Sequence, residues 1–119
     1  MYLLENYGKL EFRAGVYIFA NASLQTKYIG KAGAGRMVLE INSAIRRGKA
    51  FGATLLKALY TNSDANALSL ENALRVKYNP PNNLSIATEF LVRLILSIQG
   101  TTNNLTVSPT AKSYNHLHS

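Results

Sequence analysis

Apolar and polar residues near the N-terminus are arranged as in a β-hairpin. Apolar residues fill Gly15–Ala20, a second short apolar segment follows at Lys27–Lys31, and turn-forming residues occupy 21–23 between them. Because side chains alternate between the two faces of a strand, Tyr17 and Phe19 should share one face. We expect one face of this hairpin to hold the core and the other to present a phenol.

The periodicity then changes to that of a helix. Four apolar residues recur at the spacing of one helical face, namely Met37, Ile41, Ala44 and Ile45, and Gly48 is a typical helix terminator. Residues 54–60 fit a buried strand or a short helix equally well by periodicity. We predict a strand there, because the Asn-Ser-Asp segment at 62–64 ends it and offers N-caps to a following helix.

That following helix is predicted over about residues 65–78. Its apolar stripe would consist of Ala67, Leu70, Leu74 and Tyr78. Glu71 lies about 100° around the helix from Leu70 and therefore at the edge of this stripe. Pro80 and Pro81 should end the helix, since neither ring nitrogen can donate a hydrogen bond.

The C-terminal part is predicted to contain a third helix near 86–99. Its buried stripe would be Ile86, Phe90, Leu94 and Ile98. After Gly100 the sequence becomes rich in Thr, Asn and Ser, which favours a flexible tail. We therefore predict one domain over 1–100 and a tail over 101–119, with His116 and His118 in the tail solvated rather than bound to a metal.

Composition narrows the possible functions. The 119 residues are 47% hydrophobic, enough for one modest core, and the absence of cysteine excludes disulfides, thiolate catalysis and cysteine-bound zinc. Thirteen Lys and Arg residues against six Asp and Glu give a net charge of +7, which favours nucleic acid first and an acidic membrane surface second. No signal peptide or membrane-spanning segment is recognisable, so we expect an intracellular protein with no membrane association.

Two tripeptides and a distant acid carry a family resemblance. Gly15-Val16-Tyr17, Tyr28-Ile29-Gly30 and Glu71 together resemble the signature of the GIY-YIG nucleases. Leu70-Glu71 followed by Tyr78, Pro80 and Asn83, and Lys31-Ala32 after the second tripeptide, are similar to the excision-repair members of that family. The resemblance covers about residues 15–83. It implies a small α/β domain with a three-stranded, mostly antiparallel sheet flanked by helices.

The resemblance also implies a function, the metal-dependent hydrolysis of DNA phosphodiester bonds by an endonuclease. Tyr17 would act as the general base that takes a proton from the attacking water, and Tyr28 would orient the water or a phosphate oxygen. Glu71 would hold one divalent ion, Mg²⁺ or else Mn²⁺. A phenol is a poor base at neutral pH unless a cation lies close by, because its pKa is about 10.

The remaining site residues would bind or position the substrate. Arg36 would clamp the scissile phosphate, Lys31 would add a point charge beside it, and Gly30 would let substrate or the following loop approach the backbone closely. The Asn83 amide would tie the loop after the helix to the active-site strands.

The sequence departs from the family pattern around the arginine. Arg36 stands two positions earlier than the family's arginine, where this chain has Val38, and Glu40 replaces the Tyr or His expected one turn beyond it. An acid there would repel a phosphate, whereas Arg46 and Arg47 could compensate from the end of the helix.

Two other functions fit the same residues. The departure around Arg36 is also expected of a DNA-binding protein that has this fold but has lost catalysis. In the second alternative the tripeptides are coincidental and the chain is a basic, RNA-associated structural protein. Core tyrosines in strands, a surface arginine and a solvated helix glutamate are common in proteins that have no active site.

Overall fold

The computed structural model of the protein describes residues 1–84 and 86–102. The chain divides into two compact units, Met1–Asn83 and a second unit that begins at Leu84. His116 and His118 lie outside the described residues. The predicted boundary between a domain over 1–100 and a tail over 101–119 stays a prediction.

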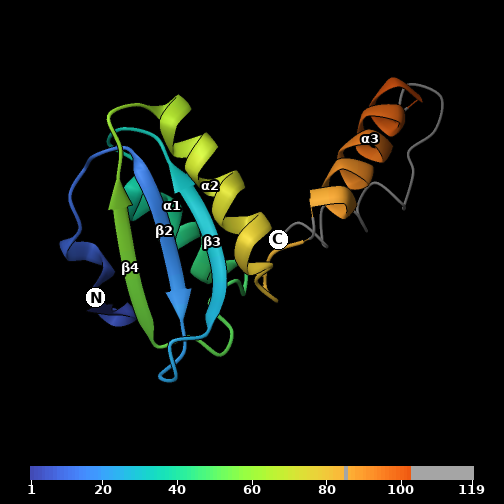
Figure 1. The fold of residues 1–119 in the computed structure, drawn as a ribbon. Helices are drawn as coiled ribbons and strands as arrows, with labels where there is room; N and C mark the ends of the chain where they lie inside the picture. Colours follow the sequence, from blue (N-terminus) through green and yellow to red (C-terminus); the bar gives the residue numbers. More distant parts are fainter. Residues whose placement is uncertain (85, 103–119) are drawn as a thin grey trace. The chain divides into compact units, whose positions relative to one another are not determined.

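The first unit is built on a four-stranded sheet with the order β1-β4-β2-β3, in which all neighbouring strands are antiparallel (Figure 1). Its strands are β1 (Tyr2–Leu3), β2 (Gly15–Ala20), β3 (Thr26–Ala32) and β4 (Leu55–Tyr60). The predicted hairpin and the predicted strand over 54–60 are confirmed. The prediction of three strands missed β1, because two residues are too few to show an alternating pattern. A short 3₁₀ segment, η1 (Leu4–Lys9), follows β1.

The register of the hairpin places the two signature tyrosines on one face. Tyr17 lies opposite Gly30, and Phe19 lies opposite Tyr28. Residues directly opposite each other in antiparallel strands point to the same side of a sheet. Tyr17, Phe19 and Tyr28 therefore project together from two neighbouring strands. Because β3 is an outer strand, Tyr28 also lies next to a free edge of the sheet.

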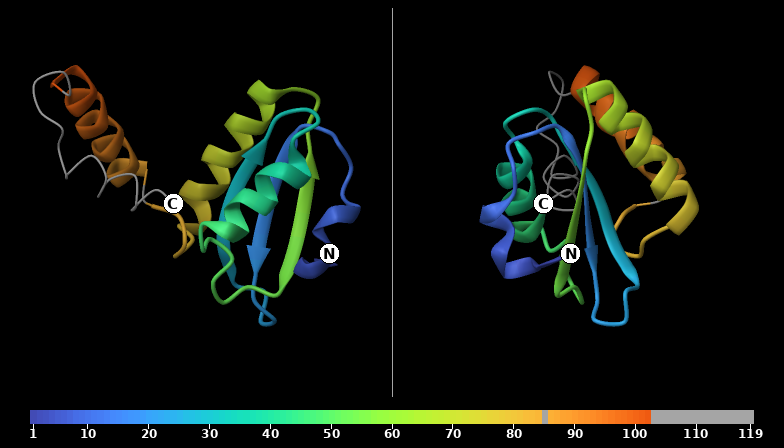
Figure 2. Two further views of the ribbon diagram at one scale, coloured as in Figure 1. Left: turned by 180° about the vertical axis from the view of Figure 1, so that it is seen from behind. Right: turned by 60° about the vertical axis from the view of Figure 1, so that its left-hand side comes forward.

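Helices cover the sheet on both faces. Figure 2 shows α1 (Met37–Arg46) on one side of the sheet and α2 (Asp64–Tyr78) on the other. The predicted helical face of α1 is confirmed, and it forms a core with the tyrosine face of the sheet: Leu10, Tyr17, Phe19, Tyr28, Ala32, Met37, Ile41, Ala44 and Leu56. The expectation that one face of the hairpin stays open to present a phenol is wrong, because α1 covers the phenols while α2 packs against the opposite face of β2 and β3.

Local sequence sets both ends of α2. The Ser63 hydroxyl accepts a hydrogen bond from the Asn66 N–H, and Asn79 ends the helix in a left-handed conformation. Of the predicted stripe, Ala67 is buried and the two leucines are half-buried. Tyr78 was predicted to be buried but is 48% exposed, because it borders an open cavity at the end of the helix.

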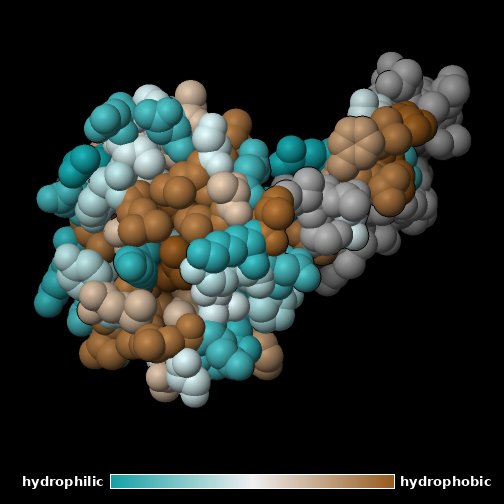
Figure 3. Space-filling view, in the orientation of Figure 1, coloured by the Kyte–Doolittle hydropathy of each residue, from teal (hydrophilic) through white to brown (hydrophobic). Residues whose placement is uncertain are grey.

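Hydrophobic side chains gather over β2 and β4 on the face that carries α2 (Figure 3). Register places Ile18, Leu55 and Leu59 there, all half-buried. α2 packs against β2 and β3, which leaves this part of the sheet partly open to solvent.

The second unit contains α3 (Ile86–Thr102), which confirms the third predicted helix. Its predicted buried stripe is wrong at Phe90, Leu94 and Ile98, because each of these side chains is exposed. None of the described helices has the length and hydropathy needed to cross a bilayer.

Candidate active site

The two signature tyrosines are packed together beneath α1. Their ring centroids lie 6.1 Å apart, and Tyr17 and Tyr28 are 1% and 9% exposed. Gly30 is what allows this packing, because a Cβ at that position would overlap the hydroxyl end of the Tyr17 ring. Gly30 was predicted to let substrate or the following loop approach the backbone closely, and that stays a prediction. In the structure the Tyr17 phenol makes a close approach to this glycine.

The environment of Tyr17 keeps it protonated. Burial raises the pKa of its hydroxyl far above the ordinary value, Tyr28 and Glu40 raise it further, and only the Arg47 guanidinium lowers it. Its hydroxyl donates one long hydrogen bond, of 3.5 Å, to the Glu40 carbonyl oxygen, and its ring packs against that of Tyr28. A water-excluded phenol with a raised pKa does not suit the predicted role of general base for Tyr17.

Two positively charged side chains lie near the Tyr28 phenol. Burial raises its pKa too, but the Arg47 guanidinium opposes this through its charge and through a hydrogen bond to the Tyr28 oxygen. The Lys49 ammonium also lies 6.0 Å from the centroid of the Tyr28 ring. The sequence shows two basic residues at the end of α1. Their spacing does not show that Arg47 faces the two phenols.

Glu71 lies on α2, on the other side of the edge strand β3, and is half-buried. Its negative charge raises the pKa of Tyr28, less strongly than burial does. Among residues 1–84 and 86–102, no cluster of three or more acidic or histidine side chains could hold a metal. One carboxylate fits a hard cation such as Mg²⁺, which keeps several waters when few protein ligands are available.

Lys31 and Arg36 line a separate cavity of about 270 Å³ at one end of the sheet, together with Glu40 and Asp64. The Arg36 Nη2 lies 3.1 Å from the Glu40 Oε1, and Nε lies 3.2 Å from the same oxygen. Because this pair is one turn apart on an exposed helix surface, it contributes only about 0.3–0.5 kcal/mol. A phosphate could therefore compete with Glu40 for Arg36.

Asp64 also lines this cavity, whereas the sequence predicted only that it could cap the following helix. Its carboxylate accepts a hydrogen bond from the Ala34 N–H at 3.2 Å and lies against Gly33. It thus fixes the loop between Lys31 and Arg36. The Asn-Ser-Asp pattern predicted the start of the helix. It could not predict the contact of Asp64 with Ala34, because the two residues are 30 positions apart in the sequence.

Asn83 binds the edge of β3, the contact that the family resemblance implies. Its Oδ1 accepts from the Ile29 N–H at 2.8 Å, and its Nδ2 donates to the Ile29 carbonyl oxygen at 2.9 Å. The neighbouring Asn82 donates from its N–H to the Lys27 carbonyl oxygen at 2.9 Å. Both contacts tie the turn after α2 to the strand that carries Tyr28, so Asn83 is a positioning residue.

The structure thus places the predicted residues in two groups, which meet at Glu40, because Glu40 lines the cavity and its carbonyl oxygen lies 3.5 Å from the Tyr17 hydroxyl. Tyr17 and Tyr28 form one cluster, to which Glu71 is linked by the effect of its charge on Tyr28. Lys31 and Arg36 line a cavity of their own.

No protein-family model matches the sequence, and no curated protein matches it significantly. Solved structures do match. One is the GIY-YIG N-terminal endonuclease domain of UvrC from Thermotoga maritima bound to its catalytic divalent cation, magnesium; it is 27% identical, with a TM-score of 0.58, over 67% of this chain and 93% of that one. Two point mutants of the same domain, one asparagine to alanine and one tyrosine to phenylalanine, are each 26% identical with a TM-score of 0.58 over 67% of this chain, and over 92% and 93% of theirs.

In fold and in sequence motif the chain is therefore similar to a GIY-YIG endonuclease domain. The first tripeptide begins β2 and the second forms the centre of β3, and the tyrosine of the first packs across the glycine of the second. The fold is the mixed α/β domain that the resemblance implies, with an antiparallel sheet between helices and one strand more than expected. This GIY-YIG fold indicates a nuclease.

Proposed function

We propose that this protein is a metal-dependent DNA endonuclease that hydrolyses phosphodiester bonds. The observation that carries this proposal is the match to a cation-bound GIY-YIG endonuclease domain. The effect of Glu71 on Tyr28 across the edge of β3 supports it, because a carboxylate beside a phenol is what a metal site next to a catalytic hydroxyl requires.

In this proposal Glu71 holds one Mg²⁺ or Mn²⁺ ion, which when bound would stabilise negative charge on the scissile phosphate. The Tyr28 hydroxyl orients the attacking water or a phosphate oxygen. Tyr17 acts as a positioning residue, because its buried ring packs against that of Tyr28. Lys31 and Arg36 bind phosphates beside the cleaved bond.

DNA is the substrate that the charge favours. A net charge of +7 attracts a polyanion without reading its sequence, so the affinity for DNA should fall steeply as salt is raised. A DNA substrate also agrees with the intracellular location that the sequence predicts.

The test is nicking of a supercoiled plasmid by the full chain in the presence of Mg²⁺. The wild type should nick the plasmid, whereas Glu71→Gln, which keeps the shape of the side chain but removes its charge, should not. Glu5→Gln changes an exposed glutamate outside this site and should nick as the wild type does. Cleavage by Glu71→Gln at the wild-type rate, or cleavage that survives EDTA, would refute the proposal.

A second candidate function is DNA binding without cleavage. The observations in its favour are the burial of Tyr17 and the ion pair that engages Arg36 with Glu40. This candidate predicts salt-sensitive DNA binding by the wild type and by Glu71→Gln, and no nicking by either protein with Mg²⁺ or Mn²⁺.

A further inference from the structure

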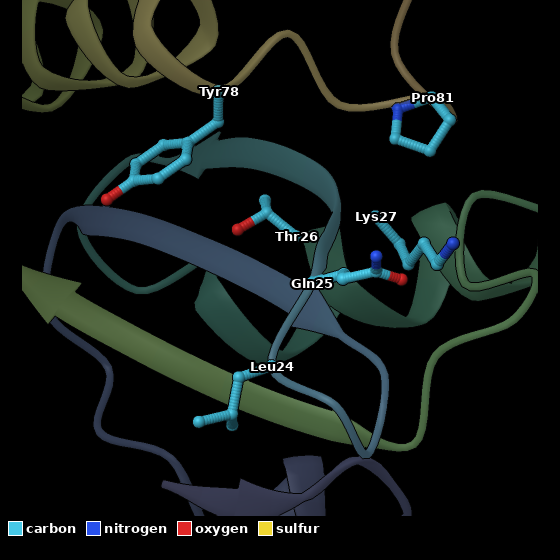
Figure 4. A pocket seen from close by; sticks show the side chains of 6 residues that line it. All are labelled: Leu24, Gln25, Thr26, Lys27, Tyr78 and Pro81. Carbon is cyan, nitrogen blue, oxygen red and sulfur yellow. The ribbon is translucent and has the colours of Figure 1, made fainter.

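A second cavity of about 380 Å³ opens where β3 begins and α2 ends. We call it the Tyr78 cavity, and it is lined by Leu24, Gln25, Thr26, Lys27, Tyr78 and Pro81. In Figure 4, Tyr78 and Pro81 border it on one side, and the residues that lead into β3 border it on the other. None of the residues assigned to the proposed active site lines it.

The cavity combines an accessible aromatic ring with positive charge. Tyr78 is 48% exposed, although it stands at a position of α2 where the apolar pattern predicts burial. The Lys77 ammonium lies 5.2 Å from the centroid of its ring, and Lys27 contributes to the lining. A half-exposed aromatic ring next to cations suits a nucleobase, which stacks on the ring while its phosphates meet the lysines.

Backbone contacts hold the two sides of the cavity in fixed positions. The Asn82 N–H donates to the Lys27 carbonyl oxygen, and its side-chain amide donates to the carbonyl oxygens of Lys49 and Phe51 at 2.9 and 2.8 Å. The turn after Tyr78 is thereby fastened to β3 and to the segment that follows α1. Such a preformed site loses little conformational entropy when a ligand binds.

The position of the cavity relates it to the proposed active site. Tyr78 follows Glu71 by seven residues, so it lies within about 20° of the same face of α2 and about 10 Å further along the helix. On β3, Lys27 directly precedes Tyr28. With about 3.4 Å per nucleotide along one strand of a duplex, 10 Å corresponds to about three nucleotides.

We propose that the Tyr78 cavity binds an unpaired nucleobase of the DNA substrate, stacked on Tyr78, about three nucleotides from the bond that is cut. A base inside a duplex is stacked on its neighbours and cannot reach a pocket without leaving the helix. The cavity therefore selects DNA with an unpaired or displaced nucleotide. This inference rests on the proposed function, because it requires that the protein binds DNA.

The test compares two labelled DNA probes by fluorescence anisotropy in EDTA, so that binding is measured without cleavage. One probe is a fully paired duplex, and the other is the same duplex with one unpaired nucleotide. The wild type should bind the second probe more tightly. Tyr78→Ala should weaken binding of the second probe roughly five- to hundredfold, the expected loss for one stacked base, and should leave the paired probe unchanged.

Two variants show whether the ring itself is responsible. Tyr78→Phe keeps the aromatic face and should bind both probes as the wild type does. Tyr2→Ala removes a tyrosine of similar exposure, 46%, from β1 at the opposite edge of the sheet, and should have no effect. Because Tyr78 is half-exposed at the last position of α2, Tyr78→Ala should keep the wild-type circular dichroism spectrum and melting temperature.

The inference is overturned if the wild type binds both probes equally, if Tyr78→Ala weakens both probes alike, or if no probe is bound. These outcomes are separable from failure of the proposed function, which is judged by plasmid nicking and its dependence on Glu71. If the protein cuts DNA but its binding does not depend on Tyr78, only this inference is refuted. If it binds the unpaired base through Tyr78 but does not cut, only the proposed hydrolase activity is refuted.

Discussion

Replacing Asn83 with alanine tests whether the turn after α2 fixes the strand that carries Tyr28. The Asn83 side chain makes two hydrogen bonds, of 2.8 and 2.9 Å, to the N–H and carbonyl groups of Ile29. These groups face the outer edge of β3, where no strand of residues 1–84 or 86–102 pairs with it. The asparagine amide therefore takes the place of a missing strand at this one residue.

The size of the effect follows from those two bonds. A hydrogen bond within a protein contributes about 1 kcal/mol net, and a buried backbone group left without a partner costs about 1–3 kcal/mol. Ile29 is 0% exposed, so water reaches its N–H and carbonyl poorly once the amide is gone. We expect Asn83→Ala to lower the free energy of unfolding by roughly 2–4 kcal/mol, a large part of the roughly 5–15 kcal/mol of a typical domain.

Urea denaturation followed by circular dichroism measures this change directly. Asn62→Ala is the matched control, because Asn62 is exposed in the turn before α2, and it should change the free energy of unfolding by less than about 0.5 kcal/mol. If Asn83→Ala is no less stable than Asn62→Ala, the amide does not hold β3 and its assignment as a positioning residue is wrong.

Three further predictions concern the site. Gly30→Ala should destabilise the protein by roughly 1–3 kcal/mol, because its Cβ would overlap the Tyr17 ring, whereas Gly8→Ala, with open space around its Cβ, should not; equal melting temperatures would contradict this. Burial raises the pKa of Tyr17, so its contribution to stability is complete below the unfolded pKa of about 10 and is lost above it, at roughly 1.4 kcal/mol per pH unit. Urea denaturation at pH 8 and 11 should therefore show a smaller loss in Tyr17→Phe than in the wild type, and equal losses would refute this account. Glu40→Gln should release Arg36 and raise DNA affinity roughly two- to fivefold at low salt, a gain that should vanish in an Arg36→Ala background.

The fold could be predicted from the sequence where a local period carries the information. The alternation in Gly15–Ala20 and the helical spacing from Met37 to Ala44 gave elements with nearly the observed bounds. The two-residue strand β1 could not be found this way, because it exists only through pairing with β4.

The site was less predictable, because its contacts join distant parts of the chain. Alternation showed that Tyr17 shares a face with Phe19, but it could not show that α1 would cover that face. The amide contact of Asn83 was predicted from the family resemblance. The effect of Arg47 on Tyr28 depends on how α1 lies on the sheet. That orientation cannot be predicted from the basic residues at the end of the helix.

The environment of Tyr28 argues for how the phenol pair acts in the proposed hydrolysis. Burial raises the pKa of Tyr28, and although the Arg47 guanidinium lowers it, the net shift is upward, so the hydroxyl keeps its proton at neutral pH. A protonated phenol has a hydrogen to donate. At the edge of β3, where the charge of Glu71 acts on the same phenol, this hydroxyl would work as a donor to a phosphate oxygen or to water. Tyr17 would fix the position of the Tyr28 ring from the core, because the two ring centroids lie 6.1 Å apart.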